Sequence, residues 1–123
     1  MNATLILIAG ALALIWLIVH LFVGGRQIAR PLLTAPDLAP IVRETQYLCW
    51  HFTSVAIAAM AGLNLWAVIA DDRAFAVAAL ILAAGFAVVG IGLVSRLGSR
   101  HSDLPQGWLF VPVAVLGLLG LGL

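Results

Sequence analysis

Four long apolar runs, separated by short polar segments, make up most of the chain. They cover residues 3–23, 47–70, 73–94 and 108–123. A helix needs about 20 predominantly apolar residues to cross the roughly 30 Å hydrocarbon core of a bilayer, and we expect each run to do so. The pattern therefore predicts an all-α polytopic membrane protein, a four-transmembrane-helix bundle that forms one integral membrane domain over residues 1–123.

The fourth run, residues 108–123, is the shortest. At about 1.5 Å per residue it reaches only about 24 Å, which is less than the thickness of the hydrocarbon core. Local thinning of the bilayer could close this gap, and a re-entrant segment is the competing interpretation. Pro112 lies one turn inside the run, where a helix tolerates proline best.

The residues between the runs predict where helices begin and end. Gly24 and Gly25 are expected to end the first helix. Asp37 is expected to cap the second helix, which would begin nearby. Between the second and third runs, Asp71 and Asp72 predict a tight hairpin in which an aspartate caps the third helix.

The arginines are distributed unevenly between these connections. The second connection contains only Arg73, beside two aspartates. Because loops rich in arginine stay in the cytoplasm, the first and third connections are predicted to be cytoplasmic and both termini non-cytoplasmic. This is the topology expected of a multi-pass protein of the inner (cytoplasmic) membrane. The arginines of the first and third connections are Arg26, Arg30, Arg43, Arg96 and Arg100.

The composition supports a membrane protein and excludes other classes. Hydrophobic residues make up 64% of the chain and charged residues only 9%, whereas a soluble domain carries about 25% charged residues. A net charge of +1 does not supply the basic surface that nucleic-acid binding requires, so no nucleic-acid partner is expected. The single cysteine, Cys49, excludes an intrachain disulfide, and no metal-binding spacing of Cys and His is present.

Small residues recur at helical spacing within the apolar runs. In lipid, helices associate through the close packing that such residues allow. They are expected to pack the bundle together, to form the interface of a homo-oligomer in the lipid bilayer, or both. These positions are Ala76, Ala79, Ala83, Ala87 and Gly90 in the third run, Ala58 and Gly62 in the second, and Gly117 and Gly120 in the fourth.

Polar residues gather at the predicted cytoplasmic ends of the helices. Glu44, Tyr47 and His51 have the spacing that places residues on one helix face. We expect His51 to point into the bundle, facing His20 of the first run at a similar depth. The candidate ligand-binding residues are His20, Arg43, Glu44, Tyr47, His51 and Arg96.

Three interpretations of this cluster are open. In the first, His20 and His51 ligate haem or a metal from facing helices. In the second, Arg43, Arg96 or Arg100 binds a lipid or quinone headgroup while His51 or Glu44 moves protons. In the third, the histidines and arginines only reach the lipid headgroups and satisfy helix ends, and this interpretation is favoured for Arg26, Arg30 and Arg100.

No catalytic motif accompanies the cluster. The sequence contains no glycine-rich nucleotide loop, no HExxH and no GxSxG, so no catalytic residue and no metal ligand is assigned. The first expectation is therefore a small binding, assembly or accessory protein of the bacterial inner membrane. The alternative is a membrane enzyme or redox protein with a haem, quinone or lipid-headgroup site at His20, Glu44 and His51.

Overall fold

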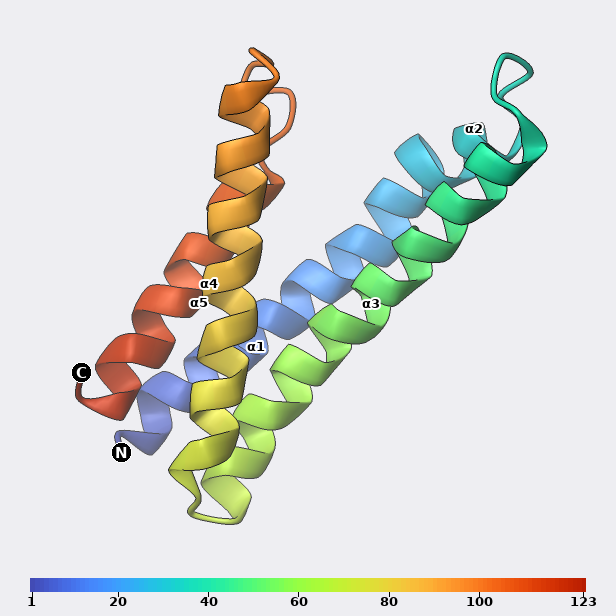
Figure 1. Cartoon of the computed structure of the whole chain (residues 1–123). Coiled ribbons are helices and arrows are strands. Elements are labelled where there is room, and N and C mark those ends of the chain that lie inside the picture. Colours follow the sequence, from blue (N-terminus) through green and yellow to red (C-terminus); the bar gives the residue numbers. More distant parts are fainter.

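Helices form the whole architecture of the computed structural model, which describes residues 1–123. The predicted all-α fold is confirmed (Figure 1). In chain order the elements are α1 (Ala3–Val19), η1 (His20–Ala29), α2 (Arg30–Leu33), α3 (Pro40–Ile69), α4 (Arg73–Arg96) and α5 (Gln106–Leu121). The first three helical segments, α1, η1 and α2, follow one another without a break. Together they form a single rod, Ala3–Leu33, which we call the first rod.

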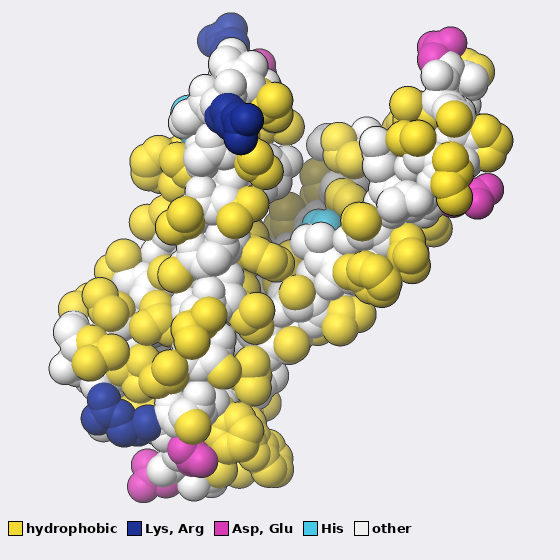
Figure 2. All heavy atoms as spheres, in the orientation of Figure 1, with side chains coloured by type: hydrophobic (Ala, Val, Ile, Leu, Met, Phe, Trp, Pro, Cys, Tyr) yellow, Lys and Arg dark blue, Asp and Glu magenta, His cyan; other side chains and the backbone are white.

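Three of the helical stretches are long and apolar enough to cross a membrane: Ala3–Leu33, Pro40–Ile69 and Arg73–Arg96. α5 is also apolar but has only 16 residues. Large apolar side chains such as Phe52 and Val88 are exposed along these helices, and Figure 2 shows them over most of the visible surface. Such a surface would aggregate in water, so the molecule is a membrane-embedded helical bundle.

The helices form a closed ring at one end of the molecule and two separate arms at the other. α1 and α4 each pack against both α3 and α5. Both termini and the α3–α4 hairpin lie at the closed end (Figure 1). Toward the other end, η1 and α2 pack against α3, while the α4–α5 arm diverges and leaves the notch seen in Figure 2.

Small residues bring the helices together in the ring. Ala79 and Ala83 of α4 are buried, as predicted from their spacing. At Gly90, an added Cβ would lie 2.6 Å from the Cα of Gly107, so the backbones of α4 and α5 are in contact. Without a hydrophobic drive between helices in lipid, this close approach supplies much of the packing energy.

The small-residue face of α3 does not take part in this packing. Ala58 and Gly62 are exposed, and nothing lies within 4 Å of a Cβ added at Gly62. This face points away from the ring because the other side of α3, which carries Met60 and Ala67, fills the core.

Two predicted helix boundaries are wrong. The first helix does not end at Gly24 and Gly25 but continues as the π-helix η1, because the contact of Gly24 with Trp50 outweighs the low helix propensity of glycine. Asp37 does not cap α3, which begins at Pro40, a residue whose fixed φ suits a first turn.

The predicted cap in the α3–α4 hairpin is confirmed. The Asp72 carboxylate accepts a hydrogen bond of 2.8 Å from the backbone N–H of Ala74. Beside it, the Arg73 guanidinium donates to the carbonyl of Leu121 at 2.8 Å and ties the hairpin to the end of α5. The hairpin is thus fixed to the closed end of the bundle.

Candidate functional site: a cationic and aromatic pocket

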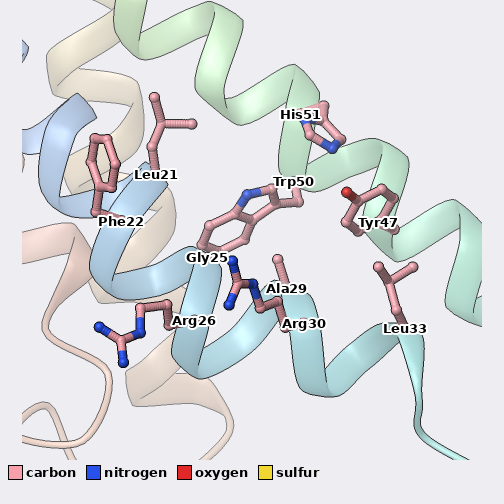
Figure 3. Close-up of a pocket in the computed structure, with 10 residues that line it drawn as sticks. All are labelled: Leu21, Phe22, Gly25, Arg26, Ala29, Arg30, Leu33, Tyr47, Trp50 and His51. Carbon is pink, nitrogen blue, oxygen red and sulfur yellow. The ribbon is translucent and has the colours of Figure 1, made fainter.

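An open pocket of about 330 Å³ lies between the η1–α2 part of the first rod and the N-terminal half of α3 (Figure 3). We call it the cationic pocket, because its lining includes two arginines and no carboxylate. The first rod contributes Leu21, Phe22, Gly25, Arg26, Ala29, Arg30 and Leu33, and α3 contributes Tyr47, Trp50 and His51.

The lining residues of the first rod repeat every four positions. One column contains Leu21, Gly25, Ala29 and Leu33, and the next contains Phe22, Arg26 and Arg30. In an α-helix with about 3.6 residues per turn, positions four apart drift around the axis. The wider turn of the π-helix η1 makes positions four apart drift in the opposite sense. Figure 3 shows the Arg30 side chain extending toward Trp50, while that of Arg26 points away from α3.

The indole of Trp50 lies between the two helices, and Figure 3 shows it above Gly25. A Cβ added at Gly24 would lie 2.5 Å from this ring, so only glycine leaves room for it. The ring of His20 stacks on the indole with 3.8 Å between centroids and 14° between planes. Gly24 and His20 therefore hold Trp50 in place on the η1 side.

His20 is held in turn by α3. Its Nε2 lies 3.1 Å from the Ser54 hydroxyl oxygen and 3.4 Å from the Trp50 carbonyl. Because the Ser54 hydroxyl itself donates to the Trp50 carbonyl at 3.1 Å, Nε2 of His20 carries the hydrogen in both contacts. His20 thus meets the second long helix through Trp50 and Ser54, and not through His51, which was expected to face it.

Half-buried Tyr47 and exposed His51 form the rim of the pocket on α3. Their rings meet edge to face with centroids 4.6 Å apart. His51 is exposed, so the prediction that it points into the bundle is wrong. Toward this end of α3 the α4–α5 arm has diverged (Figure 1), and α3 packs against η1 and α2.

The other predicted site residues lie outside the pocket. Arg43 and Glu44 are on α3, nearer its N-terminal end, and do not line the pocket. Arg96 is the last residue of α4, in the other arm. Of the six candidates, the structure therefore gathers His20, Tyr47 and His51 around Trp50.

Sequence reasoning missed Arg26 and Arg30 as pocket residues and assigned them only to headgroup contact. The signal was their spacing of four positions just after Gly24-Gly25, in a segment expected to be a loop. Both side chains are exposed, and neither makes a hydrogen bond within the chain. The only arginine side chain that does so is that of Arg73. Both arginines are thus free to meet a ligand from the wall formed by the first rod, and Arg30 is the one that extends toward Trp50 (Figure 3).

The geometry does not favour haem or metal at the two histidines. His20 uses Nε2 for its hydrogen bonds to α3, which leaves only Nδ1 as an acceptor. No group of three or more His, Cys, Asp or Glu residues could hold a metal ion. A ligand bound by arginine donors and aromatic faces fits these residues better.

A separate polar network lies in the other arm. The Trp108 indole N–H donates to Nδ1 of His101 at 3.2 Å, and Nε2 of His101 lies 3.2 Å from the Ser95 hydroxyl. Ser95 in turn donates to the Ile91 carbonyl at 2.9 Å. All of these groups bond one another, so the network fixes the α4–α5 connection and offers no open site.

No family model, curated protein or solved structure matches the chain.

Proposed function

We propose that this chain is a small binding or accessory protein of the bacterial inner membrane, without catalysis of its own. Its cationic pocket binds the phosphate group of an anionic lipid. The observation that supports this most strongly is the pair Arg26 and Arg30, which lie in one column of the pocket with no partner in the chain.

The chemistry of the pocket suits a phosphate at the membrane interface. Guanidinium groups bind phosphate through two parallel charge-assisted hydrogen bonds. The absence of carboxylates from the lining leaves this charge unopposed. Trp50 and Tyr47 have the amphipathic rings that proteins place at headgroup level, where one edge of the ring is wet and the other apolar.

The proposed orientation places the pocket in the cytoplasmic leaflet. The α2–α3 and α4–α5 connections lie at the same end of the molecule (Figure 1), and the elements at this end carry five of the six Lys and Arg residues. Arginine-rich ends remain cytoplasmic, and clusters of basic residues there attract anionic lipids. Both termini and Asp71-Asp72 would face the other side.

Titration with defined lipids followed by native mass spectrometry tests this proposal. The purified protein in detergent is mixed with phosphatidylglycerol or, for comparison, with zwitterionic phosphatidylcholine. The double variant Arg26→Gln/Arg30→Gln should bind phosphatidylglycerol at least about tenfold more weakly, because each charge-assisted hydrogen bond contributes about 1.5–3 kcal/mol.

The control is Arg96→Gln/Arg100→Gln, which removes the same charge from the other arm. It should leave phosphatidylglycerol binding near the level of the unmodified chain. Equal losses in both double variants would show that net charge alone attracts the lipid, and equal affinity for the two lipids would contradict the proposal outright.

A further inference from the structure

A second hollow lies along the same pair of helices, deeper in the predicted membrane. Its volume is about 530 Å³, and its lining is almost wholly apolar. We call it the apolar groove. On α1 it is lined by Gly10, Ala11 and Leu14, and on α3 by Ala58, Gly62 and Leu65, among others.

The apolar groove and the cationic pocket lie on one face of the helix pair. On α3, positions 47 and 51 line the pocket and positions 58, 62 and 65 line the groove. These intervals of three, four and seven residues follow a single helix face. In the first rod, Leu7 and Leu14 of the groove are followed at the same interval of seven by Leu21 of the pocket.

This shared face is turned away from the protein core. Ala11, Ala58 and Gly62 are exposed, whereas Ala9 of α1 and Met60 of α3, on the opposite sides of these helices, are fully buried. Gly62 has no side chain, and those of Ala11 and Ala58 are short, so the apolar groove forms here with leucines at its edges.

We infer that the pocket and the groove are two parts of one lipid site: the anionic headgroup binds at Arg26 and Arg30, and one acyl chain of the same lipid lies in the groove. This inference rests on the proposed function. Charge complementarity selects the occupant, because only a ligand with an anionic head and an apolar tail matches both ends. From Leu21 to Leu7 the rod extends about 21 Å at about 1.5 Å per residue, a length suited to a long acyl chain.

The direction of the channel also fits a membrane lipid. The groove runs from the arginine-bearing end of the rod toward the closed end of the bundle. An acyl chain that starts at the headgroup level must run in this direction to stay in the hydrocarbon core. The bound lipid would thus keep the orientation of its neighbours in the leaflet.

Filling the groove without touching the pocket tests this inference. Gly62→Leu places a side chain into the groove, and its matched control is Gly85→Leu, at an exposed glycine of α4 with equally open surroundings. Ala11→Leu fills the groove from the facing helix and serves if Gly62→Leu does not fold. Binding of dipalmitoyl and dihexanoyl phosphatidylglycerol is then measured by native mass spectrometry.

Gly62→Leu should weaken binding of the dipalmitoyl lipid about tenfold, as expected from overpacking. It should leave binding of the dihexanoyl lipid unchanged, and Gly85→Leu should change neither. If Gly62→Leu binds both lipids normally, the groove does not hold the chain, although the headgroup proposal survives. If the unmodified protein binds neither lipid, the headgroup proposal itself fails. A dimer that Gly62→Leu converts to a monomer would show that the groove is filled by a second copy of the chain.

Discussion

At position 24 the chain needs a residue without a side chain, because the indole of Trp50 occupies the space where a Cβ would be. Gly25, the next residue, has no atom within 4 Å of an added Cβ. Two adjacent glycines that look alike in the sequence therefore have different roles. Gly24 permits a contact between helices, while Gly25 only lines the pocket.

Alanine substitutions should separate these roles. Gly24→Ala pushes the indole off the His20 ring, and we expect it to lower the free energy of unfolding by about 1–3 kcal/mol. Gly25→Ala should be neutral or stabilise by up to about 1 kcal/mol, because alanine favours a helix. Thermal unfolding in detergent measures both. A lower melting temperature for Gly25→Ala than for Gly24→Ala would contradict the packing of Trp50.

The residue scale is also where sequence reasoning was least complete. His20 was expected to face His51, and its stacking on Trp50 was not foreseen. A tryptophan near a helix end is usually explained by the membrane interface, and one sequence does not reveal that Gly24 leaves room for its ring. Arg26 and Arg30 were missed because Gly24-Gly25 predicted a loop in which spacing has no meaning.

The backbones of α4 and α5 come into contact where two glycines meet. A Cβ at Gly90 would lie 2.6 Å from the Cα and 2.9 Å from the backbone nitrogen of Gly107. A backbone cannot move aside as a side chain can, so any larger residue must separate the helices. The spacing of small residues in the third apolar run predicted this kind of contact, but the partner across the interface came only from the structure.

Gly90→Ala should therefore lower the free energy of unfolding by about 1–3 kcal/mol. Gly92→Ala is the matched control, since Gly92 is exposed and has open space around it. Thermal unfolding of the two variants in the same detergent should show a lower melting temperature for Gly90→Ala only. Equal melting temperatures would mean that α4 and α5 do not touch at this point.

The π-helix η1 is the element that the sequence predicted least well. Glycine pairs usually end helices. That expectation did not include the contact of Gly24 with Trp50 of α3. The presence of each helix could be predicted from its apolar run, because the length and hydropathy of a segment depend on that segment alone. Helix ends and the π-helical turn depend on contacts between segments, so they could not be read from the pattern.

At the scale of the molecule, both termini meet at the closed end, and the α2–α3 and α4–α5 connections lie at the other end (Figure 1). The backbone N–H of Asn2 donates to the carbonyl of Gly120 at 2.7 Å, so the two ends of the chain are joined. This arrangement supports the proposed topology, in which the N-terminus and the C-terminus share one side of the membrane. The spacing of small residues could not predict that the arms diverge. It shows which helix faces allow close packing, but not which two faces pack against each other.

Reporter fusions test the proposed topology. A periplasm-active reporter fused to the C-terminus should be active, and the same reporter inserted in the α4–α5 connection should be inactive. Activity at the C-terminus also requires the short helix α5 to cross the bilayer. Activity in the α4–α5 connection together with inactivity at the C-terminus would invert the orientation and place the arginines outside.

The most direct test of the lipid site is the mass of the protein as it leaves its own membrane. Native mass spectrometry of the freshly purified, unsupplemented chain should show a retained anionic phospholipid, and this mass should be missing from Arg26→Gln/Arg30→Gln but present in Arg96→Gln/Arg100→Gln. A bare mass for the unmodified chain, or a retained haem or quinone in place of a phospholipid, would contradict the account.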